Sequence, residues 1–491
     1  MRLSWHDYSY YPYERELAAR EVATMFNRPA LREIPGGLEL TGVKGNGPVG
    51  RLTYFSAAVN GRVVAETLQS RLERAVRVGR TRQATRYSVH GLHEYKGKFN
   101  PQVAKALLNI FGVRSGGRVL DPFCGSGTTL VECAHADVLG VGIDINPFAV
   151  FLANAKLHAL VTPVAELRTA QRRIFRHLES SSRCIASVRG PRISYLRSWF
   201  TPEVLGVIET IRIIIEDVAD PAASVFLAVA SDQLRDYSLQ DPKDLRIRRR
   251  RTPLPDVPFA EAFSAACDRF FGRLEAVQTI LGTELPQGYA ELRDAASLSQ
   301  SAVLFDAAIT SPPYAMALPY IDTQRLSLIW LGILEPPDVS RLESELIGSR
   351  EFRGDARRTM AAALKMNAEC LPNAEAAFCL RLRDSLTSSD GFRRQAVPAL
   401  LYRYLASMRD CFRAVRDAMR PRAPFALIVG HNHTVLGGVR YDIETPTHLA
   451  ALAEDTGWTV EELLPLQTYR RYGYHVSNAV RNETLVILRN S

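Results

Sequence analysis

The sequence predicts an α/β protein in which helices cover both faces of a mostly parallel β-sheet. A strand–loop–helix–strand unit occupies part of the first third of the chain, with strands "GGRVLDPF" and "VLGVGIDI" on either side of the helix "TTLVECAHA". A βαβ unit of this kind belongs in a parallel sheet that is covered by helices. The strand-like "FDAAIT" and "FALIVG" continue the pattern much later in the chain. We expect a small N-terminal α+β unit and largely helical insertions around this sheet.

The elements of the first half follow in order. A helix, "ERELAAREVATMF", precedes strand-like "GLELTG" and "RLTYFSAAV", which glycine-rich turns separate. Beyond the βαβ unit, "VLGVIETIRIIIEDV" and "FAEAFSAACDRFFGRLEAV" have the apolar spacing of helices. This half therefore predicts an N-terminal α+β unit, the start of the sheet and a long helical insertion.

The second half returns to the sheet. We interpret "RLSLIWLG" as the helix that follows "FDAAIT", and a polar helical block comes next. A helix, "THLAALAEDTGW", then precedes two candidate final strands, "YGYHVSN" and "ETLVILRN". The boundaries that we predict are 1–88 for the N-terminal unit, 89–160, 289–335 and 401–491 for the three parts of the sheet domain, and 161–288 and 336–400 for the helical insertions.

Composition and charge limit the class of protein. The chain has 491 residues, 46% of them hydrophobic and 23% charged, which is ordinary for a globular protein with a sizeable core. A formal net charge of +9 favours a polyanionic partner. The seven cysteines show neither a C-x-x-C pair nor metal-ligand spacing with histidine, so we expect reduced thiols and no metal site. We see no signal peptide and no run near the ~20 apolar residues of a membrane span, and expect a soluble cytoplasmic protein.

The loop "CGSG" has the properties of a ligand-binding turn. Gly125 and Gly127 allow a sharp bend and the close approach of a ligand. Free N–H groups at the start of the following helix favour an anionic group. A nucleoside triphosphate loop needs a lysine after its last glycine, and a dinucleotide fingerprint needs a third glycine. Neither is present, so both ligands are disfavoured.

A carboxylate ends the next strand. Asp144 lies 17 positions after Gly127, where it can accept hydrogen bonds from both hydroxyls of a ribose. Loop and carboxylate together suit a nucleoside that carries one small carboxylate, and S-adenosylmethionine fits that description. The alternative is a purely structural turn, because a G-x-G turn by itself is weak evidence.

The strand "FDAAIT" stops at an unusual corner, "SPPY". Two consecutive prolines cannot continue a sheet ladder, because each lacks an N–H group and has its φ angle fixed. An aromatic ring, Tyr314, follows directly. The corner is therefore a stiffened backbone segment at the end of a buried strand.

Together, "DPFCGSGTTLVECA", "GVGIDINP" and "TSPPY" resemble the amino-methyltransferases that modify exocyclic amines of nucleobases. The closest resemblance is to bacterial DNA methyltransferases that make N4-methylcytosine. It covers about half of the chain and leaves both insertions out. It implies a Rossmann-like methyltransferase sheet that binds S-adenosyl-L-methionine.

The resemblance also implies site residues. The loop would hold the methionine part of the cofactor, and Asp144 its ribose. The segment "HEYKGKFNPQ" would help to close over the cofactor, and "LRDAASL" would contact the adenine, although Arg293 departs from the glycine of the family pattern. The implied cofactor-binding residues are Lys98, Phe99, Pro101, Asp121, Phe123, Gly125, Gly127, Thr128, Asp144, Ile145 and Asp294.

The catalytic residues that we expect are Ser311, Pro312, Pro313 and Tyr314. The lone pair of a base amine is delocalised into the ring, so the nitrogen is a poor nucleophile. Two hydrogen-bond acceptors, the Ser311 side chain and the Pro312 carbonyl, can draw it towards sp³ geometry, while the prolines hold the carbonyl in place. Tyr314 offers a flat face to a base that has left the duplex stack. Methyl transfer is then a direct displacement, and no Pro-Cys dipeptide exists to support a covalent route.

The identity of the amine stays open between alternatives. In the resembled family, serine at the first position of the tetrapeptide usually accompanies cytosine N4, whereas aspartate or asparagine accompanies adenine N6. The tRNA guanine-N2 methyltransferases share a loop similar to "DPFCGSGT", but their tetrapeptide begins with aspartate. A catalytically retired nucleic-acid-binding subunit is a third class, disfavoured by the intact loop and tetrapeptide.

The long insertion carries a basic run. Asp144 and Ser311 are 167 positions apart, whereas ordinary βα repeat lengths place such strands about 50–70 residues apart. The extra segment carries five arginines that we expect to face nucleic-acid phosphates, with a solvated surface as the alternative. We expect double-stranded DNA as the partner, with RNA as the alternative. His431 and His433 either border the target pocket or are ordinary loop residues. The five arginines are Arg246, Arg248, Arg249, Arg250 and Arg251.

Overall fold

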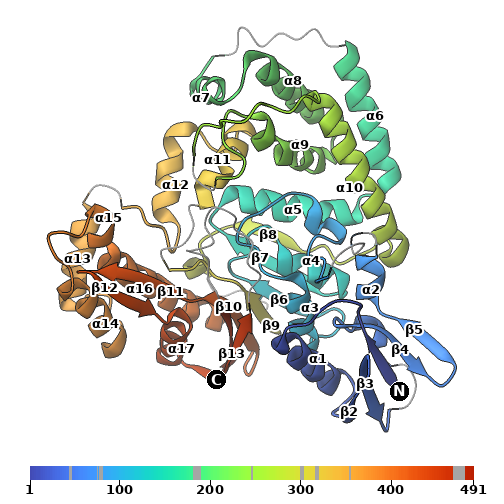
Figure 1. The fold of residues 1–491 in the computed structure, drawn as a ribbon, viewed down its shortest axis with the longest axis horizontal. Coiled ribbons are helices and arrows are strands. Elements are labelled where there is room, and N and C mark those ends of the chain that lie inside the picture. Colours follow the sequence, from blue (N-terminus) through green and yellow to red (C-terminus); the bar gives the residue numbers. More distant parts are fainter. Residues whose placement is uncertain are drawn as a thin grey trace.

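A computed structural model gives the fold, which contains two sheets and a β-hairpin among many helices (Figure 1). It describes residues 1–43, 47–74, 76, 81–180, 189–244, 247–298, 304–315, 320–352, 355–467 and 482–491.

The larger sheet has seven strands in the order β13-β14-β10-β9-β6-β7-β8. Neighbours from β8 to β10 pair in parallel, and β14 runs antiparallel to both β10 and β13. The predicted α/β class with a mostly parallel sheet is therefore confirmed. The strands are β6 Arg118–Asp121, β7 Leu139–Asp144, β8 Tyr289–Leu292, β9 Ala307–Thr310, β10 Pro424–Gly430, β13 Trp458–Gln467 and β14 Asn482–Asn490.

The central strands β9 and β10 of this sheet are buried on both faces, which explains why they are continuous apolar runs, whereas the edge strands β8 and β13 are partly exposed. Side chains alternate between the faces, as strand geometry requires. Ala307 and Ile309 of β9 join a core that includes α1 (Pro12–Met25) and α3 (Pro101–Ile110). Ala308 joins the opposite core, which α16 (Val397–Ala418) and α17 (Thr445–Asp455) complete; both helices lie beside β10 and β13 in Figure 1.

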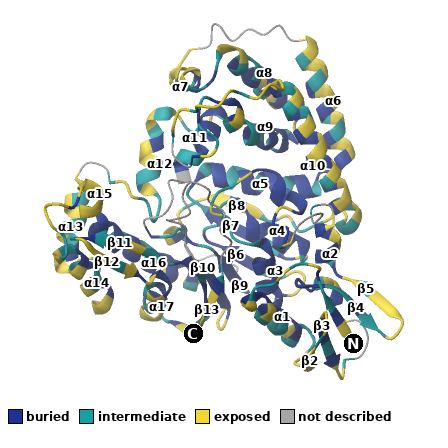
Figure 2. Cartoon of the chain, viewed as in Figure 1, coloured by how far each residue is buried: buried dark blue, intermediate teal, exposed yellow. Residues whose placement is uncertain are grey.

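The N-terminal unit is a five-stranded antiparallel sheet, ordered β2-β3-β1-β4-β5, with α1 packed against it. Its buried Glu21, on α1, accepts hydrogen bonds from the Thr53 amide at 3.0 Å and from the Asn109 side chain on α3 at 2.6 Å. Figure 2 shows this inner side buried and the rim strand β5 exposed. The strands are β1 Arg2–Trp5, β2 Ala30–Ile34, β3 Gly37–Thr41, β4 Phe55–Asn60 and β5 Val63–Glu66.

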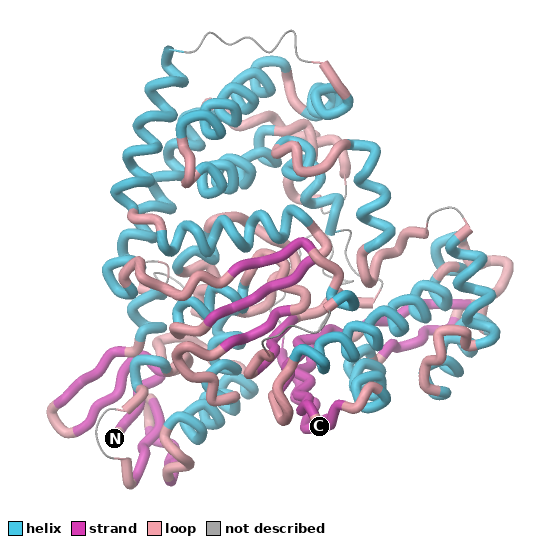
Figure 3. Tube along the Cα trace, turned by 180° about the vertical axis from the view of Figure 1, so that it is seen from behind, coloured by secondary structure: helices cyan, strands magenta, loops and turns pink. Residues whose placement is uncertain are grey.

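The first helical insertion shares one core with α5 (Pro147–Val161), the helix that follows β7. Figure 3 shows these helices stacked in layers beyond the strands of the large sheet. Within the described residues no single helix has the length and apolar composition of a membrane span; α5 and α6 pass that test only as one unit, bent by 115°. The helices of the insertion are α6 Val164–Ser180, α7 Pro191–Trp199, α8 Pro202–Val218, α9 Ala223–Tyr237 and α10 Phe259–Leu281.

In the second helical insertion, α13 (Ala356–Met366) and α14 (Asn373–Asp384) pack with α16 in the other core, whereas α12 (Val339–Glu345) joins the core of the first insertion, as does the preceding α11 (Tyr320–Trp330). The hairpin β11–β12 (Asn432–Leu436 and Val439–Ile443) follows β10 directly, where we had expected only a loop. The candidate strand "YGYHVSN" lies outside the described residues, whereas "ETLVILRN" is confirmed as β14. The helices of this part are α11 Tyr320–Trp330, α12 Val339–Glu345, α13 Ala356–Met366, α14 Asn373–Asp384 and α15 Phe392–Gln395.

Candidate active site

The candidate site lies at the carboxyl edge of the parallel strands. From β6, the chain proceeds to β7 and β8 on one side of the sheet and to β9 and β10 on the other. Such a reversal leaves a crevice outside the strand ends, and ligands of open α/β sheets bind there. The glycine loop follows β6 and the "SPPY" corner follows β9, so the two predicted segments flank this crevice from adjacent strands.

The glycine loop has the backbone that its sequence demands. Gly125 and Gly127 have φ angles of 49° and 79°, in the region that favours glycine. Gly127 is also the N-cap of α4 (Thr128–His135), so the free N–H groups of the first turn, beginning at the buried Thr128, follow the loop. A Cβ on Gly127 would lie 2.9 Å from the Cβ of Ala153 on α5. Only glycine fits this close approach of loop and helix.

Asp144 lies directly beside the loop. One carboxylate oxygen accepts the Gly125 N–H at 2.9 Å, and the other accepts the Asn146 N–H at 2.8 Å. Burial raises the pKa of Asp144 to about 6, although these backbone donors oppose the rise. Each carboxylate oxygen has two lone pairs, so both can accept further hydrogen bonds from a diol. The partly exposed Ile145 follows in the chain.

Asp294 lies at the end of the neighbouring strand. The N–H of Arg293 donates to the backbone carbonyl of Asp144 at 3.1 Å, which brings the segment after β8 against the end of β7. The exposed Asp294 caps the short 3-10 turn Ala295–Ser297 by accepting the Ala296 N–H at 2.9 Å. Its carboxylate is therefore at the same edge as Asp144.

A buried hydrogen bond joins the two halves of the site. The Thr310 hydroxyl, the last side chain of β9, donates to Asp121 Oδ1 at 2.6 Å, and the Phe123 N–H donates to the same oxygen at 3.2 Å. Burial raises the pKa of Asp121 to about 6. Asp121 thus connects the start of the glycine loop to the start of "SPPY". Phe123, two residues after Asp121 in the chain, is half-buried.

The "SPPY" corner is held by groups from the strands beyond β9. The Ser311 hydroxyl donates to the Ile428 carbonyl of β10 at 2.9 Å. Pro312 is buried and Pro313 half-buried, and the Asn432 side chain donates to the carbonyl of Ala315. The Tyr314 hydroxyl donates to Glu483 of β14 at 2.6 Å. The corner is anchored on both sides of Pro312.

Sequence reasoning missed Glu483, whereas it named His431 as a residue that either borders the target pocket or is an ordinary loop residue. Glu483 has its pKa raised by burial, while the Tyr314 hydroxyl opposes that rise. His431 contacts Glu444 at 2.7 Å and Thr484 at 2.9 Å, so it belongs to the wall behind the corner, whereas His433 is exposed. No local sequence pattern indicates the role of Glu483, because its partner Tyr314 is 169 positions away.

The upstream segment lies against the loop through a residue that we did not predict. A Cβ on Gly125 would lie 3.4 Å from the ring of Tyr95. Lys98 donates instead to the carbonyls of Thr85 and His90, at 2.9 and 3.3 Å. Phe99 packs against the core of the N-terminal unit, and the buried Pro101 opens α3. The predicted roles of Lys98, Phe99 and Pro101 at the cofactor stay predictions.

The arginine run divides into inward and outward side chains. Arg250 donates to the carbonyls of Asp236 and Ser238 at 2.6 and 2.9 Å, so its guanidinium closes the end of α9. Arg248 pairs with Asp244, Arg249 lies over the Trp199 ring, and Arg251 is exposed. Arg246 lies outside the described residues. A phosphate-binding role stays a prediction for the run, and the inward contacts of Arg250 make it the least available member.

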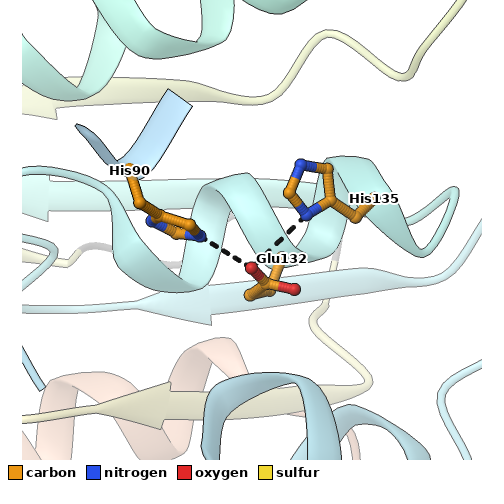
Figure 4. Close-up of side chains that lie close together, drawn as sticks. All are labelled: His90, Glu132 and His135. Carbon is orange, nitrogen blue, oxygen red and sulfur yellow. Dashed lines mark hydrogen bonds and ion pairs between the residues drawn. The ribbon is translucent and has the colours of Figure 1, made fainter. Parts of the chain in front are cut away.

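In the described part of the chain, metal-ligand side chains gather at α4, the helix that follows the glycine loop (Figure 4). His90 and His135 both point towards the carboxylate of Glu132, at 2.7 and 3.3 Å, and all three are buried. The Tyr87 hydroxyl donates to the same oxygen at 2.7 Å. We had expected no metal site, and this cluster was not visible in the sequence because Glu132 and His90 are 42 positions apart.

The distances in this cluster suit shared protons better than a metal ion. A zinc ion about 2.0–2.1 Å from each ligand atom keeps those atoms more than about 3 Å apart in a tetrahedral site, whereas His90 Nε2 and Glu132 Oε1 are 2.7 Å apart. Burial lowers the pKa of His90 to about 3, so its ring is neutral and donates one N–H. Burial would raise the pKa of Glu132, but His135 and His90 lower it well below its usual range. We interpret the cluster as a hydrogen-bonded network that joins residues 87–90 to α4.

Comparison with known proteins agrees with this site. Residues 92–182 match the family described as RMKL-like, methyltransferase domain. The chain is 50% identical over 70 residues to the type II methyltransferase M.MjaII of Methanocaldococcus jannaschii, which is 14% of this chain and 13% of that protein. It is 24% identical over 278 residues to the type II methyltransferase M.BsoBI of Geobacillus stearothermophilus, covering 50% of this chain and 53% of the relative.

A third similarity is shorter. The chain is 44% identical over 52 residues to the tRNA (guanine(10)-N2)-dimethyltransferase of Methanothermobacter thermautotrophicus, or 11% of this chain and 16% of that protein. The chain spans about half, or less, of the length of these relatives. Residues 92–182, which contain the glycine loop and β6 and β7 of the parallel sheet, are thus similar to a methyltransferase domain. Its longer similarities are to type II methyltransferases.

The geometry of Gly127 yields a stability and binding test. Gly127→Ala adds a Cβ that meets Ala153 at a φ of 79°, whereas Gly116→Ala has a φ of 76° and nothing within 4 Å. We expect Gly116→Ala to lower the free energy of unfolding by about 1–2 kcal/mol, the strain of the left-handed conformation alone. Gly127→Ala should lower the free energy of unfolding by more than this, and it should weaken S-adenosylmethionine binding about tenfold or more. Urea unfolding and calorimetry measure both, and equal effects of the two variants would contradict the close-approach argument.

The Glu132 network yields a second test. Glu132→Gln removes a buried charge that faces Tyr87 and two histidines, so we expect a loss of about 3–5 kcal/mol in unfolding free energy. The exposed Glu166→Gln on α6 is the matched control and should stay within about 0.5 kcal/mol of the parent. We expect a chelator to leave the thermal midpoint unchanged. One equivalent of metal in the purified protein, lost together with stability on chelation, would replace the hydrogen-bonded interpretation.

Proposed function

We propose that the chain is an S-adenosylmethionine-dependent DNA methyltransferase that modifies the exocyclic amine of a flipped-out base, with cytosine N4 as the target. One observation carries the proposal: the glycine loop and the "SPPY" corner end adjacent parallel strands, and Thr310 and Asp121 join them at 2.6 Å. A methyl donor held by the first segment therefore lies next to an amine held by the second.

The cofactor half of the site fits S-adenosylmethionine. The cofactor supplies an electrophilic methyl group on a sulfonium. The loop N–H groups and the start of α4 suit its carboxylate, and the Asp144 carboxylate suits its ribose hydroxyls. Asp294, at the end of the next strand, suits the adenine amine. These groups bind and orient, which is the main contribution that a direct transfer needs.

Ser311 is oriented to accept a hydrogen bond. Its hydroxyl proton is directed to the Ile428 carbonyl at 2.9 Å, so the oxygen lone pairs remain for an incoming N–H. The Pro312 carbonyl is the second acceptor in our proposal. Two acceptors on one amine withdraw its N–H bonds from the ring plane and return electron density to nitrogen. The excess proton leaves after transfer, to water or through Ser311.

Tyr314 is the stacking platform for the extruded base. Its hydroxyl donates to Glu483 at 2.6 Å, which fixes one edge of the ring. A fixed ring loses little freedom on stacking, and stacking of this kind contributes about 1–3 kcal/mol per base. We propose duplex DNA as the partner, with phosphate contacts from the outward members of the arginine run. The similarity to type II methyltransferases supports DNA and a restriction–modification setting.

A second candidate is methylation of guanine N2 in tRNA. The similarity to a tRNA (guanine(10)-N2)-dimethyltransferase favours it, although that match covers 11% of this chain. Adenine N6 of DNA is a further target that the same geometry accommodates. Serine at the first position of the tetrapeptide favours cytosine N4 over both. The anchored Ser311 and Tyr314 also disfavour a retired binding subunit, which needs neither.

The product identifies the function. The protein is incubated with labelled S-adenosylmethionine and either duplex DNA or tRNA, the nucleic acid is digested, and the methylated nucleoside is identified by mass spectrometry. We expect N4-methylcytosine from DNA, and none from the Ser311→Ala variant. N6-methyladenine would transfer the proposal to adenine, and N2-methylguanosine from tRNA with unmodified DNA would overturn it. Cofactor binding without any product would indicate the retired subunit.

Two substitutions of Tyr314 separate the ring from its anchor. Tyr314→Ala removes the stacking face, so we expect kcat/KM for DNA to fall about 5- to 150-fold, the equivalent of 1–3 kcal/mol. Tyr314→Phe keeps the ring but loses the bond to Glu483, and we expect a several-fold fall. Both variants should bind the cofactor as the parent does. Unchanged turnover in Tyr314→Ala would remove the stacking role.

A further inference from the structure

Lys156 of α5 is a buried cation bonded directly to the glycine loop. Its ammonium donates to the Ser126 carbonyl at 2.7 Å and to the Ser126 hydroxyl at 2.9 Å, and the side chain is fully buried. Within the described residues, no carboxylate forms an ion pair with Lys156. A buried ammonium without such a pair is costly, so its retention needs a reason.

The βα unit formed by β7 and α5 contacts each of the three residues of the Gly125–Gly127 turn. Asp144, at the end of β7, accepts the Gly125 N–H. Ala153 of α5 packs against Gly127, and Lys156, one helical turn further on, binds Ser126. Residues three apart share one helix face, so Ala153 and Lys156 form a single support behind the loop. Lys156 is the charged member of this support.

Lys105 offers a comparison elsewhere in the fold. It is also buried, but its ammonium donates to Gln69 and lies near the acidic side chains of Glu132 and Glu21, away from the loop. Lys156 instead has its positive charge against Ser126, inside the loop whose N–H groups suit an anion. A charge in that place strengthens the attraction that the helix start already exerts.

We propose that Lys156 is a positioning residue that holds the Ser126 turn in its cofactor-binding shape and adds a positive charge behind the site of the cofactor carboxylate. The inference rests on the proposed function. It means that α5, through Lys156, contributes to cofactor affinity, which the sequence of the glycine loop alone does not indicate.

The charge on Lys156 responds to pH. Burial lowers the pKa of Lys156 to about 7, Arg86 lowers it further, and Asp232 and Cys124 oppose the fall. His93 also faces this charge. The ammonium is therefore charged below pH 7 and loses its proton above it. Asp144 and Asp121 change charge near pH 6, so the range from pH 7 to 9 isolates Lys156 from them.

Calorimetry with S-adenosylmethionine tests the proposal on the full chain. We expect Lys156→Met to raise the Kd about tenfold or more at pH 7, the effect of losing hydrogen bonds from a charged donor. The ratio of variant to parent Kd should shrink towards pH 9, as the parent loses its charge. The amino group of the free cofactor titrates near pH 8, and parent and variant meet the same free cofactor, so the ratio of the two Kd values removes this contribution. In turnover, KM for the cofactor should rise with little change in kcat.

Two further variants separate a local role from general destabilisation. Lys105→Met is the matched control, with an equally buried lysine, and should leave the Kd within about twofold. Lys156→Gln keeps one donor without the charge and should bind with intermediate affinity; it also serves if Lys156→Met does not fold. Equal Kd in the parent and both Lys156 variants, or equal weakening in Lys105→Met, overturns the inference. A parent that binds no cofactor overturns the proposed function itself, which is a different result.

Discussion

The site depends on the pairing of β6 with β9. These two strands are adjacent and parallel although the residues that end them, Asp121 and Thr310, are 189 positions apart. Their side chains share a buried hydrogen bond at 2.6 Å, and the Thr129 hydroxyl at the start of α4 donates to the Ile309 carbonyl at 3.2 Å. Because the strands are parallel, the loops that follow them emerge at one edge. Everything that the site does chemically needs this adjacency.

The sequence predicts well whatever is local. The glycine loop can be recognised in the sequence because its positive φ angles and its contact with Ala153 allow only glycine at Gly127. The "SPPY" corner can be recognised because two prolines cannot extend a strand. The apolar central strands are visible because they are buried on both faces. The order of the strands, which reverses direction at β6, was not predicted from the sequence.

The supports of the site could not be predicted, because each joins residues that are distant in sequence. Glu483 reaches Tyr314 across 169 positions, and Lys156 reaches Ser126 across 30. The helix α5 itself was missed because it is apolar on most sides, between the sheet and the helical insertion, and so lacks the one-sided pattern of a surface helix. Composition likewise cannot show that Arg250 turns inward to the carbonyl of Asp236 in α9, and the phosphate-binding role of the arginine run stays a prediction.

Two buried charged groups near the loop, Glu132 and Lys156, differ in the partners that the protein gives them. Tyr87 and His90 donate hydrogen bonds to one oxygen of Glu132, and His135 lies close to the same oxygen, so protein groups alone stabilise the join between residues 87–90 and α4. Lys156 donates hydrogen bonds only to the carbonyl and hydroxyl of Ser126, and among the described residues no carboxylate forms an ion pair with it, although Asp232 favours its charge from further away. A protein selected for stability alone has little reason to bury such a cation, since an apolar side chain of similar size costs less. In our proposal, the carboxylate of the cofactor supplies a further anion at the glycine loop that Lys156 supports, which explains why the cation is kept.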